Sequence, residues 1–376
     1  MIWKFPTYEV GKKLDWDLLS NKFSWIAAMK GVLQDPIWHA EGDVYIHTQM
    51  VVNQLIALPA FSSLSEQDKH ILVAAAIFHD IEKRSTTTKE IIEGKERIVS
   101  PKHAKKGEFT TRTILYKAIP TPFYIREQIA KLVRLHGLPI WAIDKDNPSK
   151  EVIYASLLVN TQHLALLAKA DVLGRICIDQ ADMLLRVDLF AELCKESNCF
   201  GKPKAFTSNY GRYLYFNKVA SSPDYIPFDD FKFDVIVMCA LPGSGKDTYI
   251  KNNLQLPVLS LDDIRRMNKI SSTDKKKNGQ VIQLAKEKAK EYMRKRAPFI
   301  FNATNISVDM RRKWIGLFID YGARVKIIYI EVNYKQLRIQ NNNREHKVPE
   351  AVLDKMILKL EIPTCKEAHD IEYVIH

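Results

Sequence analysis

Short apolar runs alternate with helical patterns in the C-terminal part of the chain. Each run has the length of a strand, and the stretches between runs carry apolar residues at helical spacing, as in 281–296. Strands that alternate with helices favour a parallel, doubly wound sheet, so we predict an α/β domain in this part of the chain. The apolar runs lie at 235–240, 257–261, 298–301, 325–330 and 371–375.

The N-terminal part of the chain has a different pattern. Its apolar run at 71–78 is far too short to cross a membrane and is interpreted as a buried helix. Between 199 and 234, Gly, Pro and Ser interrupt the helical patterns and tyrosines accumulate. Because a solvated chain contains few aromatic residues, we interpret this stretch as an ordered linker. The predicted divisions are a first domain at 1–200, a linker at 201–232 and a second domain at 233–376.

Composition agrees with two domains. A chain of 376 residues exceeds the usual length of one domain, and an apolar content of 46% can build two cores. The 56 Lys and Arg residues outnumber the 44 Asp and Glu residues, and the resulting charge of +12 fits a polyanionic partner. Five cysteines without a C-x-x-C pair predict reduced thiols in the cytoplasm, and neither a signal peptide nor a membrane span is expected. The candidate contacts to a nucleic-acid backbone are Lys102, Lys105, Lys106 and 275–277. The alternative is that these lysines form a solvated charged face.

The first apolar run leads into a glycine-bearing turn and a lysine, the order of elements that holds nucleotide phosphates. Small residues let backbone N–H groups approach the phosphates, and Lys246 can reach the β and γ oxygens. In the G-x-x-x-x-G-K-[ST] pattern, Ala240 replaces the first glycine and Asp247 replaces the residue that normally holds magnesium. A carboxylate beside phosphates requires a cation between them, so we expect Asp247 to hold Mg²⁺. The expected nucleotide-binding residues are Pro242, Gly243, Ser244, Gly245, Lys246, Asp247 and Thr248.

Charged residues follow the second apolar run. Asp262 and Arg265 come directly after the run at 257–261, and open α/β sheets bind substrates at the carboxyl ends of their strands. Asp262 is therefore placed to accept a proton from an attacking hydroxyl. The third run leads to Asn302, where a carboxylate could have been expected. Magnesium would then depend more heavily on Asp247.

The second domain resembles the 5′-OH polynucleotide kinase family, which phosphorylates the 5′-hydroxyl of RNA or DNA with a nucleoside triphosphate. The resemblance implies that Asp262 is the general base, that Lys246 is catalytic, and that the donor is ATP or another NTP with Mg²⁺. It also implies that Arg265 contacts the phosphate of the acceptor's terminal nucleotide and that Arg344 is a lid arginine on the donor phosphates. The matching segments are 242–246, 261–265, 302–305, 311–312, 341–344 and 348–349.

The N-terminal half carries a separate set of histidines and acidic residues. The adjacent pair His79 and Asp80 ends an apolar run, and Lys83 follows His79 at the spacing of one helical turn. Arg175 has the same relation to Asp171. A histidine–carboxylate metal site with a cation one turn away suits a phosphoester. The metal supplies hydroxide, and Lys83 or Arg175 neutralises phosphate charge.

This ordered set resembles the HD-domain phosphohydrolases, and residues 34–47 and 79–83 look especially like the HD module of bacterial tRNA nucleotidyltransferases. The resemblance implies an all-α helical domain that acts on 2′,3′-cyclic phosphates and on 2′- or 3′-phosphates. His39 is expected to contact substrate phosphate, with an ordinary loop histidine as the alternative. The resemblance also implies two ions of a transition metal such as Mn²⁺, Co²⁺, Ni²⁺ or Zn²⁺. The first would be held by His47, His79, Asp80 and Asp171, and the second by Asp80, His103 and His136.

Together the halves are similar to bacterial end-healing enzymes in which an HD phosphoesterase precedes a polynucleotide kinase. Such an enzyme would act on RNA ends, with DNA ends as the alternative, and an RNA ligase would be its functional partner. Two alternatives remain open at this point. One is an HD nucleotide phosphohydrolase fused to a nucleoside or other small-molecule kinase. The other is a nucleic-acid-binding or sensor protein that binds ligands without turnover.

Overall fold

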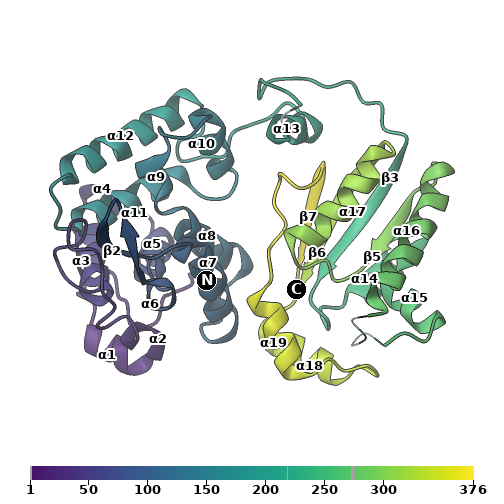
Figure 1. Cartoon of the computed structure of the whole chain (residues 1–376), viewed down its shortest axis with the longest axis horizontal. Coiled ribbons are helices and arrows are strands. Elements are labelled where there is room, and N and C mark those ends of the chain that lie inside the picture. The colour runs from purple at the N-terminus through teal and green to yellow at the C-terminus, as the bar shows by residue number, and fades with distance from the viewer. Residues whose placement is uncertain (1, 218, 272–273, 275) are drawn as a thin grey trace. The chain divides into compact units, whose positions relative to one another are not determined.

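The protein is described by a computed structural model that covers residues 2–217, 219–271, 274 and 276–376. Lys275, one of the lysines expected to contact nucleic acid, lies outside the described residues. Contacts along the chain divide it into two compact units, Met1–Lys204 and Ala205–His376. The first unit is mainly helical and the second contains a parallel sheet (Figure 1), so the predicted fold class is confirmed.

Helices form the first unit, apart from one hairpin. Helix α5 begins after Ser65, whose hydroxyl accepts a hydrogen bond from the Asp68 N–H, and it ends at Phe78. All the residues from 70 to 78 are buried, as the apolar run predicted. The hairpin pairs β1 (Thr88–Ile92) with antiparallel β2 (Lys95–Val99) and was not predicted. The helices are α1 (Trp16–Lys22), α2 (Ser24–Ala27), α3 (Val44–Ala57), α4 (Pro59–Ser62), α5 (Glu66–Phe78), α6 (Lys83–Thr86), α7 (His103–Lys117), α8 (Phe123–Leu135), α9 (Leu138–Trp141), α10 (Pro148–Ser156), α11 (Thr161–Leu173) and α12 (Gln180–Glu196).

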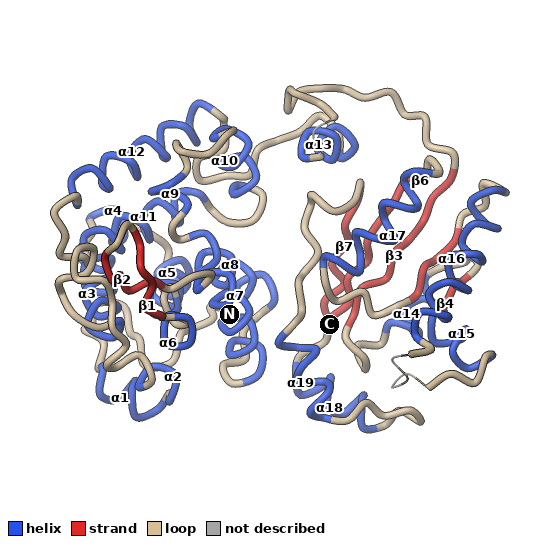
Figure 2. The backbone as a smooth tube through the Cα atoms, in the orientation of Figure 1, coloured by secondary structure: helices blue, strands red, loops and turns tan. Residues whose placement is uncertain are grey.

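The second unit is built on a five-stranded sheet with the order β4-β5-β3-β6-β7. Every neighbouring pair of these strands is parallel, and Figure 2 shows the sheet bordered by helices. The strands are β3 (Phe233–Ala240), β4 (Val258–Ser260), β5 (Phe299–Asn302), β6 (Ala323–Glu331) and β7 (Asp370–Ile375). The helices are α13 (Asn209–Phe216), α14 (Lys246–Asn253), α15 (Leu261–Met267), α16 (Asn278–Arg294), α17 (Val308–Asp320), α18 (Tyr334–Asn342) and α19 (Glu350–Leu358).

The strand order places the candidate nucleotide site at the carboxyl ends of the strands, which we call the ligand-binding edge of this sheet. The central strand β3 lies between β5 and β6, and the chain leaves it through α14 toward β4, on the far side of β5. The connection from β5 through α17 to β6 crosses back over β3. Ligands of open α/β sheets bind at the carboxyl ends of the strands where the strand order reverses. The carboxyl ends of β3 and β5 are therefore the expected ligand-binding edge.

The stretch expected to be a linker, 201–232, contains helix α13 and is mostly part of the second unit. The rings of Tyr210, Tyr213 and Phe231 lie 5.3, 4.5 and 4.7 Å from the ring of His369, just before β7. Arg212 donates a hydrogen bond of 2.7 Å to the carbonyl oxygen of His369. The tyrosines that suggested order therefore attach this segment to the sheet domain.

None of the helices in the described part of the chain has both the length and the apolar content needed to cross a membrane.

Candidate functional site

The turn between β3 and α14 has the backbone shape of a phosphate-binding loop. Gly243 and Gly245 have φ values of +88° and +84°, in the left-handed region that favours glycine. A Cβ atom at Gly243 would also lie 3.2 Å from the backbone nitrogen of Asn341 in α18. Helix α14 begins at Lys246, directly after the turn, so its first N–H groups face the loop.

Lys246, Asp247 and Asn302 contact one another at the carboxyl ends of β3 and β5. The Lys246 ammonium group donates a hydrogen bond to Asn302 Oδ1 and lies 3.0 Å from Asp247 Oδ1. Asn302 Nδ2 donates a hydrogen bond of 2.8 Å to the same carboxylate oxygen. Burial alone would raise the pKa of Asp247, but the Lys246 charge, the Asn302 hydrogen bond and the Arg344 charge lower it below its usual value.

Asn302 stands at the end of β5, where a carboxylate could have been expected. Its side-chain amide links Lys246 to Asp247, a carboxylate in the first turn of α14. An ionised carboxylate with an amide oxygen nearby is the kind of oxygen ligand that Mg²⁺ prefers.

Asp262 and Arg265 lie at the same edge of the sheet. Ser260 is the register partner of Asn302 across β4 and β5, and Asp262 follows in the first turn of α15. The Asp262 side chain is 63% exposed, and its Oδ1 lies 2.9 Å from Arg265 Nη1. Arg265 Nη2 also donates a hydrogen bond of 3.0 Å to Asn278 Oδ1. The two residues predicted to serve the acceptor thus form one ion pair, in which Asp262 is exposed and Arg265 is half-buried.

A cleft of about 490 Å³ opens beside the phosphate-binding loop. One wall is formed by Ser244, Gly245 and Thr248, three of the residues expected to bind nucleotide. Val332, Asn333, Gln336 and Gln340, after β6 and in α18, also line the cleft. The cleft places a space for a small molecule next to the N-terminus of α14.

In the first unit, four predicted metal ligands converge on one point. His47 Nε2 in α3 lies 3.1 Å from Asp171 Oδ1 in α11 and 3.3 Å from His79 Nε2. Asp80 Oδ2 lies 3.3 Å from His79 Nε2 and 3.7 Å from His47 Nε2. All four side chains are at most 2% exposed. We call His47, His79, Asp80 and Asp171 the first cluster, and its nitrogen and carboxylate ligands suit a transition-metal ion.

A second cluster consists of His103, His136 and the same Asp80. The other carboxylate oxygen of Asp80, Oδ1, lies 3.3 Å from His103 Nε2 and 3.9 Å from His136 Nε2. Oδ1 is buried and accepts no hydrogen bond from any described residue. A buried carboxylate oxygen without a partner is unfavourable unless a cation lies beside it. The two oxygens of Asp80 thus fit a carboxylate that bridges two metal ions, one in each cluster.

Backbone contacts leave the correct histidine nitrogens free for a metal. In His79, His103 and His136, Nδ1 lies 2.7–2.8 Å from the carbonyl oxygen three residues earlier. A carbonyl only accepts, so Nδ1 carries the proton and Nε2 keeps its lone pair. Burial also lowers the pKa of His136 to about 3, which favours the neutral ring that binds metals.

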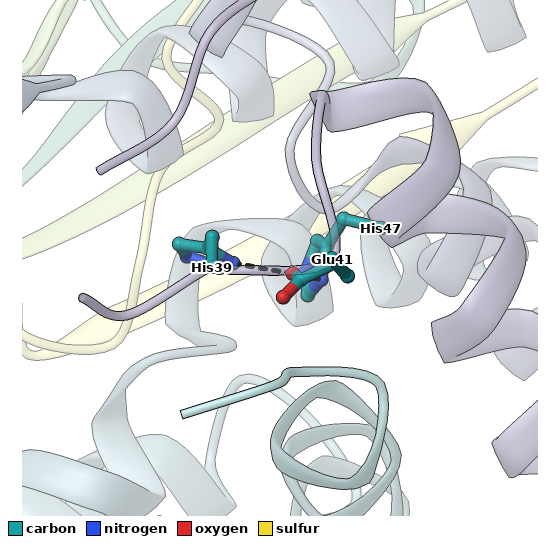
Figure 3. A group of neighbouring side chains, drawn as sticks. All are labelled: His39, Glu41 and His47. Carbon is teal, nitrogen blue, oxygen red and sulfur yellow. Dashed lines mark hydrogen bonds and ion pairs between the residues drawn. The ribbon is translucent and has the colours of Figure 1, made fainter. Parts of the chain in front are cut away.

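Glu41 belongs to this site and was missed in the sequence analysis. Figure 3 shows its carboxylate beside the rings of His39 and His47. Its Oε1 lies 2.7 Å from His39 Nδ1 and 2.8 Å from His47 Nδ1, and its side chain is 1% exposed. Burial would raise the pKa of Glu41, but hydrogen bonds from His39, His47 and the Ile176 N–H lower it below its ordinary value. The ionised carboxylate therefore accepts from both Nδ1 atoms. The only sequence signal was an acidic residue between two histidines of interest.

The two cations predicted to face phosphate are both paired with cluster carboxylates. Lys83 Nζ lies 2.8 Å from Asp80 Oδ2, and Arg175 contacts Asp171 Oδ1 and Oδ2 at 3.0 and 2.6 Å. The expected helical spacing of Lys83 from His79 was wrong, because α5 ends at Phe78 and α6 begins only at Lys83. The intervening turn still brings Lys83 to the cluster.

These ion pairs keep both acidic ligands charged. Burial would raise the pKa of Asp80, but the Lys83 charge holds it well below its usual range. The Arg175 charge has the same effect on the pKa of Asp171. Both carboxylates are thus available as anionic ligands.

Comparison with known protein families identifies the class of the second unit. A family model described as an AAA domain matches residues 235–363. The match begins in β3, ends before β7, and includes the phosphate-binding loop, Asp262, Asn302 and Arg344. The second unit is accordingly a P-loop domain of the kinase-like class, which implies the use of a nucleotide and Mg²⁺. The matched segment covers less than half of the chain and lies wholly within the second unit.

Proposed function

We propose that the chain is a bifunctional enzyme that heals nucleic-acid ends. The second unit would transfer the γ-phosphate of ATP or another NTP to 5′-hydroxyl ends. The first unit would remove 2′,3′-cyclic phosphates and 2′- or 3′-phosphates. RNA cleavage often leaves these ends, whereas a ligase requires a 3′-hydroxyl and a 5′-phosphate. RNA is therefore the proposed substrate, and an RNA ligase is the proposed functional partner.

The edge of the sheet in the second unit supports the kinase reaction. Asp262 is exposed and can accept the proton of an attacking hydroxyl, while Lys246 can stabilise charge on the transferred phosphoryl group. Arg265, 2.9 Å from Asp262, is proposed to hold the phosphate of the acceptor's terminal nucleotide. Arg344 is proposed to contact the donor phosphates, and Asp247 to hold Mg²⁺, which would screen the phosphate charge when bound.

The phosphoesterase is supported most directly by Asp80. Its two oxygens face separate histidine clusters, and one of them has no hydrogen-bond partner among the described side chains and backbone groups. Bound metal would supply a hydroxide nucleophile and polarise the phosphate. Free Nε2 atoms on His79, His103 and His136 would hold the ions, with His47 and Asp171 completing the first cluster. Lys83 and Arg175 would keep both carboxylate ligands ionised and add positive charge near the phosphate.

The test uses one RNA with a 5′-hydroxyl and a 2′,3′-cyclic phosphate. The protein is incubated with ATP and either Mg²⁺ or Mn²⁺, Co²⁺ or Ni²⁺, and both ends are then analysed. Phosphorylation of the 5′ end should require Mg²⁺ and ATP. Loss of the cyclic phosphate should require a transition metal and no ATP. An RNA that keeps both original ends under all conditions would contradict the proposal.

Matched variants assign the two reactions. Lys246→Ala and Asp262→Ala should each lower 5′ phosphorylation by at least ~10²-fold and leave cyclic-phosphate removal intact. Asp263→Ala, one position along the same helix, is the control and should keep both activities. His79→Ala should abolish only cyclic-phosphate removal. If a free nucleoside is phosphorylated better than a 5′-hydroxyl oligonucleotide, the small-molecule kinase alternative is correct.

A further inference from the structure

Gln34 has a buried side-chain amide nitrogen that donates a hydrogen bond to none of the described residues. The side chain lies in the segment before α3, and the residue is 8% exposed. Its Oε1 accepts a hydrogen bond of 2.8 Å from Lys83 Nζ. Lysine can only donate, so the amide oxygen must face Lys83 and Nε2 must face away from it. Nε2 is buried without a hydrogen-bond partner in the described part of the chain.

The cations near Gln34 already have protein acceptors. The Lys83 ammonium group has three protons and lies within reach of three acceptors: Gln34 Oε1 and Asp80 Oδ2, both at 2.8 Å, and His39 Nε2 at 3.4 Å. His39 Nδ1 donates to Glu41, so Nε2 of this neutral ring is an acceptor. The expected phosphate donors Lys83 and His39 are therefore committed to each other and to Asp80 and Glu41.

We propose that Gln34 Nε2 donates a hydrogen bond to a phosphate oxygen of the substrate. This inference rests on the proposed phosphoesterase function of the first unit. A buried N–H group without an acceptor is unfavourable, and an anionic phosphate oxygen is a strong acceptor. Lys83 joins Gln34 to Asp80, so the amide lies one side chain away from the carboxylate that both clusters share. Gln34 thus recognises the phosphate itself and would serve cyclic, 2′- and 3′-phosphates alike.

The test compares two substitutions in the full-length protein loaded with Mn²⁺. Gln34→Met keeps the size of the side chain and removes the amide. Gln34→Glu keeps an oxygen for Lys83 and replaces the donor by an oxygen that repels phosphate. In both variants, KM for the 2′,3′-cyclic phosphate and the calorimetric Kd for inorganic phosphate should rise by about tenfold, more for Gln34→Glu. Bound metal and 5′ phosphorylation should match the wild type, whereas Gln34→Met loses the hydrogen bond from Lys83 and should melt at a lower temperature.

A second glutamine provides the control. Gln67 has both amide atoms satisfied by Trp3, because Oε1 accepts from the Trp3 N–H at 2.9 Å and Nε2 donates to the Trp3 carbonyl oxygen at 3.2 Å. Gln67→Met should leave KM and phosphate affinity unchanged. If Gln34→Met also has wild-type KM and phosphate affinity, the amide is satisfied by water and the inference is wrong. Loss of bound metal in both Gln34 variants would equally overturn it, since the amide would then support the clusters.

Failure of the proposed function gives a different result. If the wild type hydrolyses no 2′- or 3′-phosphate end but binds inorganic phosphate through Gln34, the phosphate contact is supported and the phosphoesterase is not. If the wild type hydrolyses these ends with no contribution from Gln34, the phosphoesterase is supported and the contact is not.

Discussion

Glu41 is the residue whose position decides how His47 is presented to the first cluster. A carboxylate that accepts the Nδ1 proton of a metal-binding histidine fixes the ring and directs its Nε2 lone pair at the metal. Glu41 Oε1 makes this contact with His47 at 2.8 Å, and its Oε2 accepts from the Ile176 N–H at 2.9 Å. Both oxygens are thus occupied as acceptors.

Replacing this carboxylate should weaken metal binding. In Glu41→Gln only one oxygen remains, so the amide nitrogen faces either a histidine N–H or the Ile176 N–H. We expect the affinity for Mn²⁺ to fall by ~10–100-fold, the usual effect of losing a hydrogen-bond partner of a ligand. Titration calorimetry on the metal-free protein measures this change. The exposed Glu90→Gln in β1 is the control, and equal affinities in the two variants would contradict the role of Glu41.

Asp247 is the second residue with an unusual role, because it stands where most P-loops have Ser or Thr. If its carboxylate holds Mg²⁺, Asp247→Ala should raise the Mg²⁺ concentration for half-maximal 5′ phosphorylation at least ~10-fold. Asp247→Ser should keep part of the activity, since a hydroxyl is the usual ligand. Magnesium titrations of the two variants are compared with Asp234→Ala, an exposed change in β3. An unchanged titration in Asp247→Ala would assign Mg²⁺ to another group.

At the scale of elements, the strands of the second unit were predictable, whereas the hairpin of β1 and β2 and the turn after α5 were not. Strands of a parallel sheet are nearly continuous apolar runs, and each of the runs became one of the strands β3 to β7. The end of α5 was harder to place, because His79 to Glu82 have no residue that marks a turn. Glu41 could not be found by periodicity, since its contacts with His39 and His47 depend on the path of a loop.

Because α13 packs on His369, which contacts β6, the stability of β6 depends on pH. His369 Nδ1 accepts a hydrogen bond of 2.9 Å from the Val325 N–H in β6, which requires the neutral ring. Burial lowers the pKa of His369 from its ordinary value of 6.5 to about 4. An unfolded chain therefore takes up the proton at a higher pH than the folded one. The stabilising contribution is complete above pH 6.5 and is lost as the pH falls toward 4.

This dependence can be measured at β6. Between pH 6.5 and 4, the lowered pKa of His369 corresponds to a loss of ~3 kcal/mol in the free energy of opening β6. Hydrogen exchange of β6 amides, corrected for intrinsic exchange rates, should show this loss in the wild type between pH 6.5 and 4. His369→Asn keeps an acceptor for the Val325 N–H but does not titrate, so its β6 protection should vary much less. Equal pH dependence in both proteins would show that His369 is not responsible.

At the scale of the whole molecule, the boundary between the units decides which segment can work alone. Composition suggested a linker up to residue 232, because Gly, Pro and Ser interrupt the pattern there. The tyrosines of α13 instead pack on His369, a contact between residues more than 150 positions apart. Sequence patterns report local structure, so a helix that belongs to a distant partner is easily assigned to a linker.

A segment that begins at Ala205 should therefore be more stable than one that begins at Pro223. The shorter segment loses the ring contacts of Tyr210 and Tyr213 with His369 and the hydrogen bond from Arg212. Aromatic pairs and hydrogen bonds of this kind contribute about 1 kcal/mol each, so we expect a loss of ~2–3 kcal/mol, measured by urea unfolding. Equal stabilities would mean that α13 adds nothing to the second unit. The longer segment should also phosphorylate 5′-hydroxyl ends and leave cyclic phosphates untouched. If it folds, as judged by circular dichroism, but cannot phosphorylate, the proposal of two independent sites is wrong and the kinase needs residues from the first unit.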